Sequence, residues 1–243
     1  MTPRLPKIAV VMPALNEEAV IARVIAGVRA QGIHDIVVVD DASSDNTAEV
    51  ARAAGATVVP LIVQLGAWGA TQAGIRFAVR KGFNTIITMD ADGQHNPADI
   101  SKLLTPLSTG RANVAIGACT QRGSLLRKIA WRWIKTVSGI TLEDVTSGFR
   151  AYDRLALRRL ASWQATLMEY QDIGVLLLLQ RTNMIIEDIP VSMESRSNGK
   201  SRIFHNWGVV AYYMAHTLLL GFCKRARARR PSMDPAVVYK VSR

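Results

Sequence analysis

Short apolar runs alternate with helical patterns through the first half of the chain. Runs rich in Val and Ile are separated by stretches whose apolar residues recur at helical spacing. The pattern predicts strands at residues 7–12, 36–40, 85–89 and 114–117. Between them it predicts helices, at residues 17–31, 47–54, 71–81 and 97–107. This alternation predicts an α/β fold in which helices flank a mostly parallel sheet.

Helix-ending and helix-starting residues agree with this pattern. Gly32, Gly55 and Gly82 each follow a predicted helix, where a C-terminal glycine is expected. Asn96 and Pro97 form an N-cap and first-turn pair for the fourth helix. The helix boundaries are therefore predicted by two independent signals.

The second half of the chain is less regular. It predicts a basic helix at about 124–138, a loop at 143–150, helices at 154–162 and 169–181, and a strand at 184–189. The apolar stripe at 173–179 is expected in the core. We divide the chain into an α/β domain, residues 1–205, which includes the basic helix at about 124–138, and an apolar and basic segment with a tail, residues 206–243.

Composition narrows the class of protein. The 243 residues are 49% hydrophobic and 20% charged, with a formal net charge of +11. This excludes disordered, collagen-like and disulfide-scaffold proteins. Cys119 and Cys223 lie far apart without metal-ligand spacing, which indicates reduced thiols and a cytosolic chain. The N-terminus lacks the apolar length of a secretory signal.

The positive charge is concentrated in two windows. Residues 100–142 hold seven Lys and Arg and no acid, and residues 195–230 hold eight and no acid. Both windows also carry aromatic residues, and the second contains the apolar run 207–222, which either spans a bilayer or, as we favour, lies in its interface. A basic helix of a soluble protein and a nucleic-acid surface are the alternatives. We favour amphipathic membrane-associating helices, because a nucleic-acid surface does not need the apolar run.

Two carboxylate pairs follow predicted strands. Asp40 and Asp41 end one strand, and Asp90 and Asp92 follow another. Ligands of open α/β sheets bind at this edge. Asp90 and Asp92 lie on the same side of an extended segment and form an oxygen-rich set with Gln94, which suits Mg²⁺ or Mn²⁺ better than zinc. A D-x-D pattern alone is weak, but its place after a buried strand indicates a metal and nucleotide site.

Four motifs carry a resemblance to a known family. They are PALNEE at 13–18, VVVDDASSDNT at 37–47, TMDADGQHNP at 88–97 and DVTSGFRAY at 144–152. In this order and spacing they resemble the family 2 glycosyltransferases, which have the Rossmann-like GT-A fold. The nearest branch is that of dolichol-phosphate mannose synthase and bacterial polyprenyl-phosphate glycosyltransferases. The resemblance spans about residues 7–205.

The resemblance implies a site, residue by residue. The nucleotide-sugar pocket would be formed by Pro13, Ala14, Asn16, Glu17, Asp41, Asp90 and Arg202. The metal, Mg²⁺ or Mn²⁺, would be held by Asp90, Asp92 and Gln94. Catalysis would involve Asp92, Asp144 and Arg150, and the acceptor phosphate would be bound by Arg122, Arg127, Ser147 and Arg196.

The implied activity is metal-dependent inverting transfer of a hexose from a nucleotide diphosphate sugar to a polyprenyl phosphate. The enzyme would act peripherally at the cytoplasmic face of the membrane, with a membrane-embedded partner protein as an open option and no nucleic acid. An ionised lipid phosphate needs no general base. If the acceptor were instead a lipid-linked saccharide or polysaccharide, Asp144 would be the first candidate base. A nucleotidyltransferase and a basic nucleic-acid-binding protein are more remote alternatives.

Several residues also have a purely structural interpretation. Glu17 and Glu18 could serve only to favour the first turn of a helix through its dipole. Trp68 is expected to pack in the protein, and His95 is expected to be a turn residue beside the metal loop. Where many family members have Gly-Ser-Arg, this chain has residues 117–119 as Gly-Ala-Cys, so Arg122 would replace the arginine or the acceptor would differ.

Overall fold

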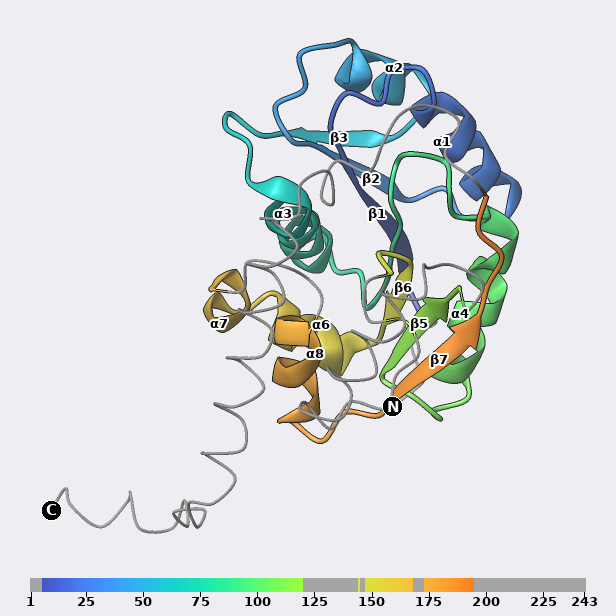
Figure 1. Cartoon of the computed structure of the whole chain (residues 1–243), viewed down its shortest axis with the longest axis vertical. Coiled ribbons are helices and arrows are strands. Elements are labelled where there is room, and N and C mark those ends of the chain that lie inside the picture. The colour runs from blue at the N-terminus through green and yellow to red at the C-terminus, as the bar shows by residue number, and fades with distance from the viewer. Residues whose placement is uncertain (1–5, 120–143, 145–146, 168–172, 195–243) are drawn as a thin grey trace, which may run out of the picture. The chain divides into compact units, whose positions relative to one another are not determined.

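A mixed sheet forms the centre of the described protein (Figure 1). The computed structural model describes residues 6–119, 144, 147–167 and 173–194. Within them the strand order is β3-β2-β1-β4-β6-β5-β7. The strands are β1 (Ile8–Ala14), β2 (Ile36–Asp40), β3 (Thr57–Pro60), β4 (Thr85–Thr88), β5 (Val114–Ala118), β6 (Arg150–Tyr152) and β7 (Ile186–Pro190). Only β6 runs antiparallel to its neighbours among these strands, so the prediction of a mostly parallel sheet is confirmed.

Helices cover both faces of the sheet, as predicted. They are α1 (Ile21–Ala30), α2 (Thr47–Ala53), α3 (Gly66–Arg80), the 3₁₀ turn η1 (Pro97–Asp99), α4 (Ile100–Ser108), α6 (Arg154–Leu160), α7 (Trp163–Thr166) and α8 (Ile173–Gln180). In Figure 1, α1, α2 and α4 lie on one side of the sheet, and α3, α6, α7 and α8 lie on the other. These layers leave the carboxyl edge of the sheet to the loops.

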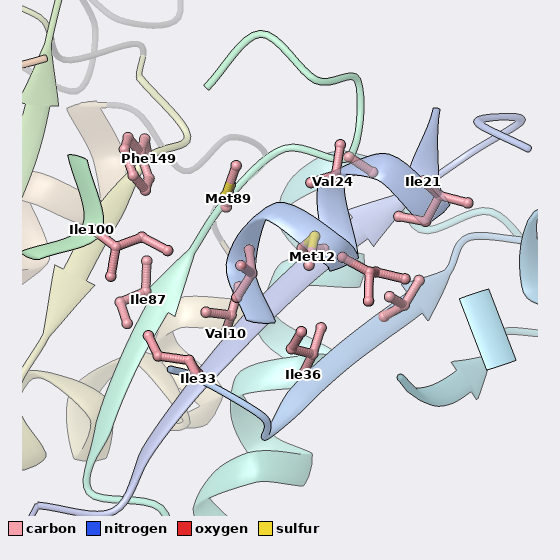
Figure 2. Close-up of a cluster of buried hydrophobic side chains, with 14 of the residues drawn as sticks. Val10, Met12, Ile21, Val24, Ile33, Ile36, Ile87, Met89, Ile100 and Phe149 are labelled. Carbon is pink, nitrogen blue, oxygen red and sulfur yellow. The ribbon is translucent and has the colours of Figure 1, made fainter. Parts of the chain in front are cut away.

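The hydrophobic core fills the space between the sheet and α1 and α4 (Figure 2). Alternate residues of β1, such as Val10 and Met12, meet Ile21 and Val24 of α1, and all four are buried. Ile87 of β4 and Ile100 of α4 extend the cluster toward Phe149. Each such side chain stabilises the fold by about 1.5–3 kcal/mol. β2 and β4, which lead into the two carboxylate pairs, therefore lie on either side of β1 and contribute buried residues to the same core.

Two strands escaped prediction for physical reasons. β3 is a four-residue edge strand whose residues are all at least partly exposed, so it lacks a buried run. β6 has only three residues, and its first is an arginine. Its pairing with both β4 and β5 joins segments about 60 and 35 residues away, which no local pattern reveals.

Helix boundaries shifted at two places. α1 begins at Ile21 rather than residue 17, and no acidic residue lies in its first turn, so the helix-dipole interpretation of Glu17 and Glu18 is wrong. α3 begins at Gly66 rather than residue 71, because Gly66 and Gly69 obscure the helical pattern. The Asn96 cap is confirmed, since its side chain accepts a hydrogen bond from the Ala98 N–H at 3.0 Å.

The predicted helix at 124–138 and the segment 206–243 lie outside the described residues, as does the predicted domain boundary. The described residues belong to one compact unit drawn from residues 1–122 and 142–199. Across the ranges that the structure describes, no helix combines the length and apolar character needed to cross a bilayer.

Candidate active site at the carboxyl edge of the sheet

The two carboxylate pairs lie on either side of one strand. β1 pairs with β2 on one side and with β4 on the other. Asp40 is the register partner of Ala14, and Asp90 follows β4 by two residues. Two strand spacings separate the pairs, or about 10 Å. That gap suits a nucleotide whose base and diphosphate ends need different partners.

The loops after β1 and β2 are joined by a hydrogen-bond network. The Asn16 side chain accepts from the Ser44 N–H at 2.8 Å, and the Asn16 N–H donates to Ser43 Oγ at 3.0 Å. The Glu17 N–H donates to Thr47 Oγ1 at 2.8 Å. Asn16 has a φ of 53°, a left-handed conformation that asparagine tolerates. The loops formed by PALNEE and DDASSDNT are therefore joined and together form one side of the candidate site at the carboxyl edge of the sheet.

Asp45 adds a further hydrogen bond between the same two loops. Burial acts to raise its pKa, but hydrogen bonds from the Thr47 side chain and from the backbone N–H groups of Thr47 and Glu18 outweigh it and lower the pKa. Glu18 returns a contact to the same loop by accepting from the Asn46 N–H at 2.9 Å. The second acidic residue of PALNEE thus serves the loop junction.

Asp41 connects β2 to the start of α3. It is 4% exposed, and its carboxylate accepts from the Leu65 N–H at 2.7 Å and from the Gly66 N–H at 3.0 Å. Its own N–H donates to the Ala14 carbonyl at 2.8 Å. Beside it, Asp40 Oδ1 is buried and has no hydrogen-bond partner among the described residues.

Asp90 and Asp92 lie on the loop after β4. The Asp90 side chain is 42% exposed. Asp92 Oδ1 accepts from the Gln94 N–H at 3.1 Å, which folds the loop into a tight turn. The Gln94 side chain is buried, and its amide nitrogen lies 3.5 Å from the Glu194 carbonyl oxygen.

This donor set fits a hard divalent cation. Carboxylate and amide oxygens are the ligands that Mg²⁺ and Mn²⁺ prefer. Within the described ranges, no three or more His, Cys, Asp and Glu residues gather as a complete ligand set. A pair of carboxylates beside an open edge instead suits an ion that takes its remaining ligands from water and substrate phosphates. The assignment of Gln94 as a third ligand stays a prediction.

The SGFR segment leads into β6 at the same edge. Thr88 of β4 and Ile116 of β5 are both register partners of Arg150, which is fully buried. Arg150 Nε donates to the Ser147 carbonyl at 2.7 Å, and Ser147 Oγ accepts from the Phe149 N–H at 3.2 Å. Arg150 thus has a structural position between two strands, and its predicted catalytic role stays a prediction.

A segment after β7 is fastened to the metal loop. Buried Asp99 accepts from both the N–H and the Oγ of Ser192 at 2.8 Å, and it pairs with Lys102 at 2.6 Å. The Glu194 N–H donates to the Gln94 carbonyl at 2.8 Å. Sequence analysis missed this role of Asp99, because its partner lies 93 residues away and a single serine has no recognisable pattern.

The structure places the other predicted site residues as follows. Pro13 and Ala14 end β1, and half-buried Asp144 lies in the loop before SGFR. Trp68 is buried and donates to the Ala165 carbonyl at 2.9 Å, so its packing role is confirmed. The predicted phosphate-binding and loop arginines lie outside the described residues: Arg122, Arg127, Arg196 and Arg202.

Comparison with known proteins agrees with the geometry. The sequence model of glycosyl transferase family 2 matches residues 9–163. An undecaprenyl-phosphate mannosyltransferase from Micrococcus luteus is 27% identical over 90% of this chain and 96% of its own length. A polyprenol monophosphomannose synthase from Mycolicibacterium smegmatis is 31% identical over 62% of this chain. That match covers 63% of the M. smegmatis enzyme, less than two thirds of its length.

Solved structures support the fold. Glucosyl-3-phosphoglycerate synthase from Mycobacterium tuberculosis, in complex with phosphoglyceric acid, superposes with a TM-score of 0.70 at 24% identity. The superposition covers 89% of this chain and 80% of that one. The same enzyme in complex with Mn²⁺ and UDP-glucose gives a TM-score of 0.67. The family match covers the whole of the sheet edge from β1 to β6, and this chain belongs to glycosyl transferase family 2, as a glycosyltransferase with the GT-A fold.

Proposed function

We propose that this glycosyltransferase moves a hexose from a nucleotide diphosphate sugar to a polyprenyl phosphate, with inversion and with a divalent metal ion. The observation that carries the proposal is the convergence of Asp41, Asp90 and the SGFR segment on one edge of the sheet. The M. luteus relative, named for undecaprenyl phosphate and aligned over nearly its whole length, supports the acceptor.

The donor would lie across the carboxyl end of β1. The nucleoside would occupy the side of Asp40 and Asp41, at the end of β2. The diphosphate would lie about 10 Å away, beside the loop after β4. Asn16, Glu17 and the residues of the joined loops would line the wall between these positions, because their backbone is already fixed by hydrogen bonds.

Asp90 and Asp92 would hold Mg²⁺ or Mn²⁺, with Gln94 as the expected third ligand. When bound, such an ion supplies positive charge that offsets the charge of the departing diphosphate. By holding that ion, the two carboxylates would favour the diphosphate at this end of the pocket, with the sugar toward the SGFR segment. This orientation is the main contribution of the protein to a reaction limited by alignment.

The chemical step needs no base. An oxygen of the ionised lipid phosphate forms a bond to the anomeric carbon of the sugar, while the bond from that carbon to the nucleoside diphosphate breaks. The electron pair of that bond leaves with the diphosphate, and no proton moves. A phosphate monoester carries most of its second charge at neutral pH, because its second pKa is near 6. The predicted arginines would bind the acceptor phosphate through their planar forks.

An exposed apolar loop beside the donor edge supports action at a membrane surface, which we propose to be the cytoplasmic face. In the β3–α3 loop, Ile62, Val63 and Leu65 are 98%, 62% and 52% exposed. The loop is held at both ends, because the Leu61 N–H donates to the Asp40 carbonyl and the Leu65 N–H donates to Asp41. A fixed loop that presents apolar side chains is typical of an interaction surface. A lipid interface would bring the prenyl chain to the site.

Calorimetric titration with UDP and with GDP, each with Mn²⁺ and with EDTA, tests the donor site. Metal-dependent binding of one nucleotide is the expected result and also names the base. Transfer of labelled sugar to undecaprenyl phosphate in vesicles then tests the acceptor, and activity of the purified chain alone would show that no membrane-embedded partner is needed. A folded chain that binds neither nucleotide would overturn the proposal.

A further inference from the structure

The carboxylate of Asp90 is flanked on two sides by residues outside the predicted ligand set. On one side is His95, whose Nε2 lies 3.1 Å from Asp90 Oδ2. On the other side is Gly148 of the SGFR segment, two residues before β6, where the lack of a side chain leaves room for the carboxylate. The two residues lie 53 positions apart in sequence, and the pairing of β4 with β6 brings both of them next to Asp90.

His95 is a buried residue, which its place in a polar turn did not predict. It is 3% exposed, and its ring packs against Phe149 with centroids 5.1 Å apart. Phe149 is itself fully buried in the core cluster of Figure 2. The His95 backbone also forms a bridge with Met193. Packing and backbone pairing therefore fix the ring.

The polar contacts of the His95 ring point to a single role. Nδ1 is buried and has no hydrogen-bond partner within the described part of the chain. Nε2 faces Asp90, so the tautomer that carries its proton on Nε2 donates to the carboxylate. A buried ring that makes one polar contact is oriented by that contact, and it orients its partner in return.

Gly148 is needed for space. A Cβ atom placed on it would lie 2.6 Å and 2.7 Å from the two carboxylate oxygens of Asp90. Gly148 is not among the residues with a positive φ, so any residue could adopt its backbone conformation. Thr88 Oγ1 donates to the Gly148 carbonyl at 2.8 Å and fixes the backbone there. Only the absence of a side chain lets the carboxylate lie where His95 meets it.

We infer that His95 and Gly148 are positioning residues that hold the Asp90 carboxylate in one orientation for the divalent metal. The inference rests on the proposed function, because Asp90 is a metal ligand only under that proposal. Groups that orient a metal ligand typically affect metal affinity by about 10- to 100-fold. The SGFR motif thereby contributes to the metal site through the small size of its glycine.

The test measures Mn²⁺ affinity at saturating UDP or GDP, whichever the unaltered chain binds, by calorimetry. His95→Ala and Gly148→Ala should each weaken Mn²⁺ binding by about 10- to 100-fold. His95→Gln, whose amide N–H can reach the carboxylate, should recover most of the loss. His34→Ala is the matched control, because His34 is exposed and lies far along the chain from the site. Thermal melting confirms that each variant is folded.

A metal-free measurement separates the two proposals. Two-bond ¹H–¹⁵N spectra of the histidine rings should show the His95 proton on Nε2, with a shift that changes in Asp90→Asn more than in Asp92→Asn. A proton on Nδ1 alone would overturn the inference. So would folded His95→Ala and Gly148→Ala variants with unaltered Mn²⁺ affinity. Lack of Mn²⁺-dependent nucleotide binding by the unaltered chain would overturn the proposed function instead, and the ring spectra would still decide whether His95 orients Asp90.

Discussion

The two halves of the sheet are built by different kinds of contact. In the N-terminal half, β3, β2, β1 and β4 are all parallel, and β4 pairs with β1 although Ile8 and Thr85 lie about 77 residues apart. In the C-terminal half, β6 is inserted antiparallel between β4 and β5, and β7 pairs with β5 from about 70 residues away. The first half is therefore a run of parallel strands joined by βα units, and the second depends on one inserted antiparallel strand.

The candidate metal loop lies where these halves meet. Its acidic residues come from the end of β4, in the N-terminal half. Gly148, which leaves room for Asp90, and Ser192, which donates to Asp99, come from segments next to β6 and β7. The lesson is that a motif can supply the reactive groups while a distant segment supplies their orientation.

The largest expected effect is the loss of the metal ligand in the N-terminal half. Asp92→Asn keeps the shape of the side chain and removes its charge, so sugar transfer should fall about a thousandfold, given that a metal ion supplies several kcal/mol of charge stabilisation. The measurement is kcat/KM with labelled donor. Asp35→Asn is the control, because Asp35 is exposed at the opposite end of β2. Equal losses in both variants would contradict the metal role.

The second largest effect is expected from the hydrogen bonds between Asp99 and Ser192, which join the metal loop to the segment after β7. Asp99→Ala removes the acceptor of two hydrogen bonds from Ser192 and the partner of Lys102. The expected loss in the free energy of unfolding is about 2–3 kcal/mol, measured by urea denaturation. Glu49→Ala is the control, since the exposed Glu49–Arg52 pair should contribute under about 1 kcal/mol. Similar losses would show that these hydrogen bonds add little.

The exposed loop of the N-terminal half should have a smaller, separable effect. The double variant Ile62→Glu and Val63→Glu should bind anionic liposomes about tenfold more weakly, because it replaces apolar contact with repulsion. Sedimentation with liposomes measures this. The double variant Leu155→Glu and Leu167→Glu is the matched control, because it adds the same charge at leucines that are 54% and 71% exposed, away from this loop. If both changes weakened sedimentation equally, the effect would be one of net charge, and the loop would have no special role.

The smallest expected effect is a dependence of stability on pH. Burial acts to raise the pKa of Asp99, but Lys102 and Ser192 outweigh it and lower the pKa below its ordinary value of 3.8. A lowered carboxyl pKa stabilises the folded state above that value, and the stabilisation is lost as the pH falls further through the folded pKa. Stability should therefore decline below about pH 4, and the decline should be shallower in Asp99→Asn. Urea midpoints at pH 6, 4 and 3 provide the measurement. Parallel curves for the two proteins would contradict it.

Local signals in the sequence were enough for most strands of the sheet. Apolar runs predicted β1, β2, β4, β5 and β7 within about two residues, because a buried strand must be apolar along most of its length. Strand ends also located the two carboxylate pairs, since parallel strands bring their carboxyl ends to one edge. The four motifs predicted the family, which the family match confirms.

Other features had no local signal. The three residues of β6 carry too little pattern to be read as a strand, and Asp99 resembles an ordinary helix-start acid. The burial of His95 follows from the position of Phe149, which depends on β6. Glu17 and Glu18 looked like helix-dipole residues until the partner loop was in place.

By itself the sequence determined which residues form strands, where the acidic groups fall and to which family the chain belongs, because those depend on neighbours within a few positions. Only the tertiary structure decided that Gly148 makes room for Asp90, that His95 faces it, and that Asp99 binds Ser192. The physical reason is that orientation comes from packing and hydrogen bonds between segments 50 to 100 residues apart, whose pairing is set by the sheet as a whole.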